Sequence, residues 1–357
     1  MDEKINIVIM AGGTGTRFWP YSRNKKPKQF LDILNTGRSL LQMTYDRFLN
    51  YVTKNQIWIV SNLIYEEIIS EQIPDLPSDH ILLEPSKRNT GPCIAYASYK
   101  IRKKDPNALL VITPSDHAIF KPESFLEVIQ NAVDCVADSK KLLTIGIKPH
   151  RPETGYGYIQ YSPSNSIAKR VKTFIEKPDI DLAKKFIDTG EFVWNAGIFI
   201  WSVAAIIEAF EKHQKELADL FADGQTYYGT DEEASFIEKA YSHCKSISID
   251  YAIMEKADNV FTMLGDFGWS DLGSWNALHE LKEKDADNNI IESTALLYNS
   301  KSNYIKGKKE KLLIISDLEG YLVADFEDIL LICKKDNATK FKSFVNDVKA
   351  TKGDYFI

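Results

Sequence analysis

The chain has 357 residues, a formal net charge of -6 and 44% hydrophobic residues. This length exceeds what one hydrophobic core usually holds, so we expect one large domain and a smaller one. The negative charge argues against a general nucleic-acid-binding surface, and no stretch approaches 18 apolar residues, so no membrane span is expected.

The cysteines and the amino terminus indicate the compartment. No C-x-x-C pair occurs among the four cysteines, which argues against a zinc site and a disulfide framework; they are Cys93, Cys135, Cys244 and Cys333. The amino terminus lacks the basic and apolar regions of a signal peptide. We therefore expect a cytoplasmic protein with reduced thiols.

The first predicted element is a buried strand over residues 5–10, followed by a glycine-rich turn. Gly12, Gly13 and Gly15 allow backbone N–H groups to approach an anion closely, and Arg17 and Lys28 add positive charge. The turn leaves the carboxyl end of the strand, where open α/β sheets bind ligands. This pattern predicts a nucleoside triphosphate site.

Two better-known phosphate loops fail on spacing. Phe18 stands where the dinucleotide fingerprint needs its third glycine, and the Gly-Lys-Ser/Thr ending of the P-loop does not occur. A purely structural strand-to-helix turn stays open as the alternative for the glycines.

Apolar runs at 57–60, 108–113 and 142–147 alternate with helical patterns, which predicts an α/β fold with a doubly wound sheet. Helical spacing over 91–104 predicts a helix that Asn89 or Thr90 caps. Just before it, Glu84 follows a strand and could accept two N–H groups of guanine, while Arg88 could bind triphosphate. A helix cap and a solvated surface charge are the respective alternatives.

Two separated carboxylates could bind a metal ion. Asp116 ends the apolar strand at 108–113, and Asp271 lies in the glycine-bracketed turn GWSDLGSW. Next to a triphosphate loop, these two carboxylates are the minimum that Mg²⁺ requires, although an isolated Asp at a strand end is more often a turn or helix cap. His117 suggests a general base, but an ordering hydrogen bond is the favoured role because no nucleophile needs deprotonation.

Two of three further segments suit the hydroxyl groups of a polyol, and the third carries a pair of opposite charges. RPETGYGYI at 151–159 combines Glu153 with a glycine turn and two tyrosines, and FIEKPD at 174–179 places Glu176 next to Lys177. WNAGIFIW at 194–201 offers Asn195 as a partner for a hydroxyl group. A β-hairpin turn and an exposed charge pair remain the alternatives for the first two segments.

The chain changes character after the charged stretch at 281–289. Short β runs separated by Gly, Asp and Lys predict a small β-rich module. We expect a catalytic domain over residues 1–285 and a β-rich domain over 286–357. The short strands leave edges to cover, which makes this module a plausible contact in a homodimer.

In chain order, the motifs closely resemble those of the bacterial mannose-1-phosphate guanylyltransferases, or GDP-mannose pyrophosphorylases, of the sugar nucleotidyltransferase superfamily. The blocks are GGTGTRFWPYSRNKKPKQF, EPSKRNTGP, PSDH, PETGYGYI, EKPD, WNAGIF, SIDYAIMEK and WSDLGSW. The resemblance implies a Rossmann-like nucleotidyltransferase domain with a mixed, mostly parallel sheet, followed by a short left-handed β-helix-like domain.

The resemblance also implies residue roles. The GTP phosphates would be held by Gly12, Gly13, Gly15, Thr16, Arg17 and Lys28, with Arg88 as a further candidate for the triphosphate. Guanine and ribose would lie near Glu84, Asn89 and Thr90, and Mg²⁺ would bind Asp116 and Asp271. The mannose site would be lined by Glu153, Gly155, Glu176 and Asn195, with Lys177 on the sugar phosphate.

The expected reaction joins GTP and α-D-mannose 1-phosphate to give GDP-mannose and pyrophosphate. A pyrophosphorylase for another hexose 1-phosphate and a non-catalytic GDP-mannose-binding regulatory subunit are the alternatives. The chain ends where bifunctional relatives continue into an isomerase domain, so no isomerase activity is expected.

Overall fold

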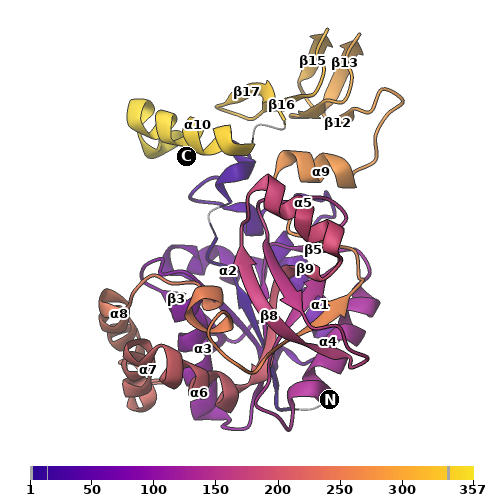
Figure 1. Ribbon diagram of the computed structural model, residues 1–357. Coiled ribbons are helices and arrows are strands. Elements are labelled where there is room, and N and C mark those ends of the chain that lie inside the picture. The colour runs from indigo at the N-terminus through magenta and orange to yellow at the C-terminus, as the bar shows by residue number, and fades with distance from the viewer. Residues whose placement is uncertain (1–2, 14, 336–337) are drawn as a thin grey trace. The chain divides into compact units, whose positions relative to one another are not determined.

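The computed structural model of the protein describes residues 3–13, 15–335 and 338–357 (Figure 1). The chain forms two compact units, one of residues 1–12 and 41–269 and the other of residues 13–40 and 270–357. The domains predicted from the sequence differ from these units at residues 13–40 and 270–285. Because close contact is not the same as independent folding, the boundary between residues 285 and 286 stays a prediction.

The first unit is built on a nine-stranded sheet with the strand order β3-β2-β1-β4-β9-β6-β10-β8-β7. Its strands are β1 (Ile5–Met10), β2 (Ile57–Asn62), β3 (Ile81–Glu84), β4 (Leu109–Pro114), β6 (Leu142–Ile147), β7 (Gly157–Tyr161), β8 (Ala168–Glu176), β9 (Phe192–Ser202) and β10 (Val260–Gly265). The first four strands pair in parallel, with Ile7 opposite Ile57 and Val8 opposite Ile112. The apolar run of β1, broken only by Asn6, is nearly continuous because its side chains are buried on both faces.

The rest of the sheet is mixed. β9 lies antiparallel between β4 and β6, and β7 pairs antiparallel with both β8 and β9. β10 is parallel to β6 and antiparallel to β8. The predicted α/β class with a mixed sheet is confirmed.

Helices cover both faces of the sheet in Figure 1. They are α1 (Leu40–Leu49), α2 (Glu66–Gln72), α3 (Thr90–Lys104), α4 (Pro122–Val136), α5 (Ile180–Thr189), α6 (Val203–His213), α7 (Lys215–Ala222) and α8 (Glu233–His243). α3, α6 and α7 pack together over one face, and α4 packs against β4, β6, β9 and β10. On the α3 side, the core joins Val8 and Trp58 of the sheet to Phe210 of α6 and Tyr241 of α8.

The start of α3 follows the predicted capping. Asn89 has a positive φ of 68°, and its side-chain oxygen accepts a hydrogen bond from the Thr90 N–H at 2.9 Å. This cap satisfies one of the N–H groups that a helix leaves unpaired at its start. The helix therefore begins at the edge of the sheet where β1 and β3 end.

The second unit contains the C-terminal β-rich part. Its elements are α9 (Trp275–Leu281), β12 (Ile290–Glu292), β13 (Thr294–Tyr298), β14 (Tyr304–Lys306), β15 (Leu312–Ser316), β16 (Tyr321–Asp325), β17 (Leu330–Lys334) and α10 (Ala338–Lys352). β12, β14 and β16 pair in parallel one after another, and β13 pairs in parallel with β15. Successive parallel pairing of this kind is typical of a β-helix-like coil. The left-handed turn of the coil stays a prediction.

Among the residues that the structure describes, no helix is both long enough and apolar enough to cross a lipid bilayer.

Candidate functional site

The glycine-rich turn after β1 contains one position that requires glycine. Gly15 has a φ of +58°, and a Cβ atom there would lie 2.5 Å from the Cβ atom of Lys28. A larger residue would both strain the backbone and displace Lys28. Arg17 follows on the short 3-10 turn Thr16–Phe18; its side chain is exposed and makes no hydrogen bond or ion pair with another described residue. The turn thus presents an uncommitted cation.

Lys28 and Asp271 meet in the second unit. Lys28 is only 4% exposed, and its Nζ donates to the main-chain oxygen of Asp271 at 2.5 Å. Bringing an ammonium group into such a buried position is costly unless it is hydrogen-bonded. The sequence predicts both residues for the site, and the structure brings this pair together across 243 positions of the chain.

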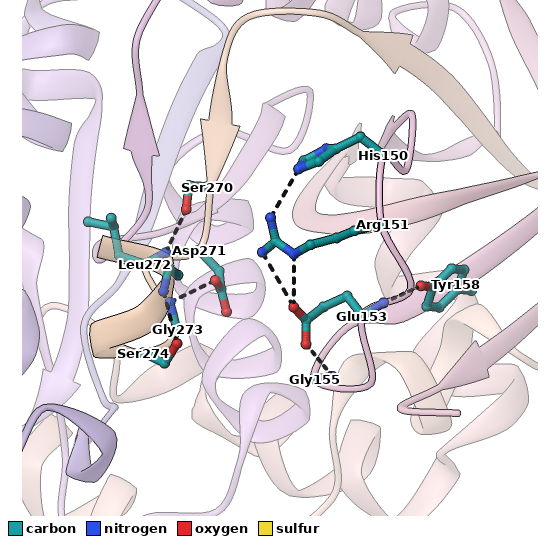
Figure 2. Close-up of polar contacts among 11 residues, drawn as sticks. His150, Arg151, Glu153, Gly155, Tyr158, Ser270, Asp271, Leu272, Gly273 and Ser274 are labelled. Carbon is teal, nitrogen blue, oxygen red and sulfur yellow. Dashed lines mark hydrogen bonds and ion pairs between the residues drawn. The ribbon is translucent and has the colours of Figure 1, made fainter. Parts of the chain in front are cut away.

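The turn around Asp271 has a fixed conformation (Figure 2). Its Oδ1 accepts from the Gly273 N–H at 2.7 Å, and the Leu272 N–H donates to Ser270 Oγ at 3.1 Å. A Cβ atom on Gly273 would lie 2.5 Å from Asp271 Oδ2. Only glycine at position 273 leaves room for the carboxylate to fold over the turn.

Asp116 lies in the first unit, two residues after β4, and its side chain is 33% exposed. The neighbouring His117 has its Nε2 3.9 Å from Asp116 Oδ1, and its Nδ1 accepts from the Trp269 indole N–H at 3.2 Å. His117 therefore contributes a hydrogen bond that orders this segment, which agrees with the role favoured from the sequence.

Glu84 ends β3 as a buried carboxyl group, 6% exposed. Its Oε1 accepts from the Tyr241 hydroxyl at 2.9 Å, and a Cβ atom on Gly12 would lie 3.4 Å from its Oε2. One oxygen is thus held by Tyr241, while the other faces Gly12 of the glycine turn.

The remaining candidate nucleotide-binding residues form hydrogen bonds with main-chain groups. Arg88 Nε donates to the Tyr241 main-chain oxygen at 3.2 Å, Asn89 caps α3, and Thr90 Oγ1 accepts from the Ile249 N–H at 2.9 Å. These contacts fix the 84–90 segment in place. Because Nε of Arg88 is engaged, the Nη1 and Nη2 groups of its guanidinium are the ones that could bind an anion.

The sugar candidates form two groups in the first unit. Glu153 accepts from the Gly155 N–H at 3.1 Å and lies 3.4 Å from Nε and Nη2 of Arg151, as Figure 2 shows. Glu176 pairs with the adjacent Lys177. A Cβ atom on Gly157 would lie 2.5 Å from Glu176 Oε2 and 3.6 Å from the Asn195 Cβ, so both side chains converge over Gly157.

Two polar residues of the site are missed by the sequence reasoning. Asp250 opens the π-helical turn Asp250–Met254, and its Oδ1 accepts from Asn195 Nδ2 at 2.9 Å. The block SIDYAIMEK, which contains Asp250, could have indicated it. Tyr241 carries no such signal, since its contact with Glu84 spans 157 residues.

Burial raises the pKa of two of these carboxyl groups. The pKa of Glu84 rises to about 7, with the Tyr241 hydrogen bond acting in the opposite direction. The pKa of Asp250 rises to about 6, through burial first and the charge of Glu176 second. Perturbed carboxyl groups next to candidate binding residues are typical of functional sites.

The raised pKa of Glu84 predicts a pH-dependent stability. From its ordinary value of 4.5 up to about 7, the folded protein keeps a proton that the unfolded chain has released, so stability falls as pH rises through this range. We expect Glu84→Gln to increase the free energy of unfolding at pH 8 by about 2–3 kcal/mol and to change it little at pH 4.5. Urea unfolding at both pH values measures this. The exposed Glu208→Gln is the control, and an unchanged pH slope in Glu84→Gln would contradict the prediction.

The metal candidates can be judged by their chemistry. Among the described residues, no group of three or more His, Cys, Asp or Glu side chains could hold a metal ion. Asp116 and Asp271 each present a carboxylate on a turn, and carboxylate oxygens are what Mg²⁺ prefers when waters and phosphates complete its shell. The donor type therefore fits a hard divalent ion.

Comparisons with known proteins agree with this picture. The family described as nucleotidyl transferase matches residues 6–288. A mannose-1-phosphate guanylyltransferase of Escherichia coli is 33% identical over 97% of this chain and 76% of its own length. Another from Salmonella montevideo is 36% identical over 97% of this chain and 74% of its own length.

A solved structure has the same fold. The crystal structure of mannose-1-phosphate geranyltransferase from Thermus thermophilus superposes with a TM-score of 0.86 at 28% sequence identity. The match covers 97% of this chain and 99% of that one.

Proposed function

We propose that this chain, which belongs to the nucleotidyl transferase family and within it to the mannose-1-phosphate guanylyltransferases, transfers GMP from GTP to α-D-mannose 1-phosphate. The products are GDP-mannose and pyrophosphate. The observation that carries the proposal is the 33–36% identity to curated mannose-1-phosphate guanylyltransferases over 97% of the chain. The arrangement of polar groups described above supports it.

On the nucleotide side, the glycine turn and the cations around it would hold the triphosphate. Gly12, Gly13 and Gly15 would offer backbone N–H groups, Thr16 a hydroxyl, and Arg17, Lys28 and Arg88 positive charge. Glu84 would accept from the ring N–H and the exocyclic amine of guanine, with Asn89 and Thr90 near the ribose. The exposure of Arg17 and the burial of Glu84 support this division of roles.

On the sugar side, Glu176 and Asn195 would bind mannose hydroxyl groups, and Lys177 would bind the sugar phosphate. Their convergence over Gly157 supports a shared pocket wall. Glu153 and Gly155 would add a second wall, held by the Arg151 contact.

Nucleotidyl transferases generally use a divalent metal ion, and for this chain we propose Mg²⁺. Asp116 and Asp271 would each contribute a carboxylate ligand. When bound, the ion would neutralise charge on the reacting phosphates.

The chemistry needs no general base. A phosphate oxygen of mannose 1-phosphate is already anionic, so it attacks the α-phosphorus of GTP directly; the new P–O bond forms as the bond to the bridging oxygen of pyrophosphate breaks. The barrier lies in bringing two polyanions together and in the charge that moves onto the leaving group. Arg17 and Lys28 would stabilise that charge, so positioning and neutralisation supply most of the acceleration.

One assay separates this proposal from its alternatives. Pyrophosphate release is measured with GTP, UTP, dTTP and ATP, each paired with mannose 1-phosphate and with glucose 1-phosphate. We expect the highest kcat/KM for GTP with mannose 1-phosphate. A clear preference for another pair would make the chain a different pyrophosphorylase, and binding of GDP-mannose without any pyrophosphate release would make it a regulatory subunit.

We also propose that the protein is a homodimer that pairs through the outward face of its β-rich part. Exposed apolar side chains gather on β13, β15 and β17: Leu296, Tyr298, Leu312, Ile314, Leu330 and Ile332. The exposed residues of β13 and β15 lie on paired neighbouring strands, and apolar surface of this kind marks interaction sites. The cytoplasmic location expected from the sequence stays a prediction.

A charge on this face is expected to separate the subunits. Ile314 is 67% exposed, and Ile314→Glu should weaken dimerisation more than tenfold, because a buried carboxylate without a partner is costly. Light scattering after size exclusion across a concentration series measures the mass. Ile64→Glu, at a residue that is 68% exposed in the first unit, is the matched control. A wild-type monomer at all concentrations, or an Ile314→Glu dimer of unchanged strength, would refute the proposed interface.

A further inference from the structure

Residues 241–250, which begin in the last turn of α8 and continue beyond it, contact both candidate substrate-binding segments of the first unit. We refer to them as the 241–250 segment. It runs along the 84–91 segment through two backbone–backbone hydrogen bonds, Ile247 N–H to the Arg88 oxygen at 3.2 Å and Gly91 N–H to the Ile247 oxygen at 2.9 Å. In a third contact, the Ile249 N–H donates to the side-chain Oγ1 of Thr90 at 2.9 Å. One stretch of chain is thus attached to the nucleotide-side loop at Arg88, Thr90 and Gly91.

At its first residue, the segment holds Glu84. Tyr241 is fully buried, and its hydroxyl donates to Glu84 Oε1 at 2.9 Å. Arg88 Nε donates to the main-chain oxygen of the same tyrosine at 3.2 Å, which fixes the tyrosine in turn. With Oε1 engaged, the Glu84 carboxylate cannot rotate freely, so its Oε2 keeps one direction toward Gly12.

At its last residue, the segment holds Asn195. The Asn195 amide oxygen accepts from the Gly197 N–H at 3.1 Å and from Thr144 Oγ1 at 3.1 Å, while its Nδ2 donates to Asp250 Oδ1 at 2.9 Å. The three contacts define which end of the amide is oxygen and which is nitrogen. Because an amide nitrogen carries two hydrogens, the Asp250 contact leaves the second N–H of Asn195 without a partner among the described residues, and it can meet a hydroxyl group.

From these contacts we infer that Tyr241 and Asp250 are positioning residues of the same reaction: Tyr241 orients Glu84 for guanine and Asp250 orients Asn195 for the hexose. The 241–250 segment thereby links the recognition of the two substrates. This inference rests on the proposed function. It adds two residues that contact no substrate themselves and act through Glu84 and Asn195.

If the Tyr241 hydroxyl had a purely structural role, its loss would have a different effect. Tyr228 is also buried, and its hydroxyl donates to the Phe221 main-chain oxygen at 2.7 Å, away from any candidate residue. Loss of that hydroxyl would lower stability without selecting between substrates. Tyr228→Phe is therefore the matched control for Tyr241→Phe.

The test of the base end uses the exocyclic amine of guanine, which inosine triphosphate lacks. We expect Tyr241→Phe to raise KM for GTP about tenfold and leave KM for mannose 1-phosphate within about twofold, as loss of a hydrogen bond to a charged group would do. The preference for GTP over inosine triphosphate should fall by a similar factor. Tyr228→Phe should change neither value. An unchanged preference in Tyr241→Phe would overturn the base half of the inference.

The test of the sugar end uses rescue by a conservative variant. Asp250→Ala should raise KM for mannose 1-phosphate about tenfold with KM for GTP unchanged, whereas Asp250→Asn keeps an acceptor oxygen for Asn195 and should restore most of the affinity. Glu233→Ala, which removes a buried carboxylate bonded to Tyr96 and Lys100, is the control for general damage. Equal effects of Asp250→Ala on both KM values, or no effect on either, would overturn the sugar half.

Failure of the proposed function gives a distinct result. If the wild type releases no pyrophosphate from any pair, calorimetric Kd values for GTP and mannose 1-phosphate replace the KM values. The inference would then be overturned if Tyr241→Phe binds GTP as tightly as the wild type and Asp250→Ala binds mannose 1-phosphate as tightly as the wild type.

Discussion

Asp271→Asn is expected to lower kcat at least a hundredfold while leaving the thermal unfolding midpoint nearly unchanged. The asparagine keeps an oxygen that can accept from the Gly273 N–H, as Asp271 Oδ1 does at 2.7 Å, so the turn retains its conformation. The variant loses the negative charge that would bind a divalent metal ion. Loss of a group that stabilises developing charge typically costs about 100–1000-fold in kcat.

Asp116→Asn is expected to behave in the same way, since the Asp116 side chain is 33% exposed and asparagine has nearly the same shape. For both variants, kcat is measured against Mg²⁺ concentration, and unfolding is followed by calorimetry. Asp266→Asn is the control, because the Asp266 side chain is 94% exposed and forms an ion pair with the exposed Lys121. Near-normal rates at limiting Mg²⁺ would remove the aspartate concerned from the proposed ligands.

The second large effect concerns Lys28. Lys28→Met should reduce kcat/KM for GTP more than a hundredfold, because it removes both a cation next to the glycine turn and the hydrogen bond to the Asp271 main-chain oxygen. Removal of one such charge-stabilising contact corresponds to roughly 3–4 kcal/mol of transition-state stabilisation. Methionine has a similar length and fills the buried space, so the fold should persist.

The matched control is Lys26→Met, at an exposed lysine two residues earlier. Initial rates across GTP concentrations, with circular dichroism for folding, separate lost chemistry from lost structure. Lys28 would be excluded from the reaction if the folded Lys28→Met variant kept a kcat/KM within about threefold of the wild type. A roughly threefold change corresponds to well under about 1.4 kcal/mol of transition-state stabilisation.

Local signals predicted the elements of the fold well. The apolar run at 5–10 forms β1, the helix predicted over 91–104 is α3 with Asn89 as its cap, and the short runs after residue 290 form strands of the β-rich part. These features depend on residues a few positions apart, which a sequence displays directly.

The directions of the strands in the sheet could not be predicted from the sequence. β9 is antiparallel to both of its neighbours β4 and β6, yet its apolar run resembles that of any fully buried strand. Because burial on both faces dictates composition, while direction depends on the path of the connections, the sequence could not place β9.

The candidate site shows the same limit. Motif spacing identified Lys28, Asp271, Glu84 and Asn195, but not the contacts that hold them. The Lys28–Asp271 contact spans 243 residues, Tyr241–Glu84 spans 157 and Asn195–Asp250 spans 55. Side chains that meet across such distances leave no periodic trace, so the contacts of Tyr241 and Asp250 could only be found in the folded chain.

The central claim is a single direct transfer of GMP from GTP onto the phosphate of mannose 1-phosphate, with no protein nucleophile. The stereochemistry at phosphorus tests it. The substrate is a single diastereomer of GTP in which sulfur replaces one non-bridging oxygen of the α-phosphate. The configuration at phosphorus in the GDP-mannose product is then determined by phosphorus NMR. The account predicts inversion, because one in-line displacement inverts the centre; retention would require two displacements through a guanylylated residue and would contradict it.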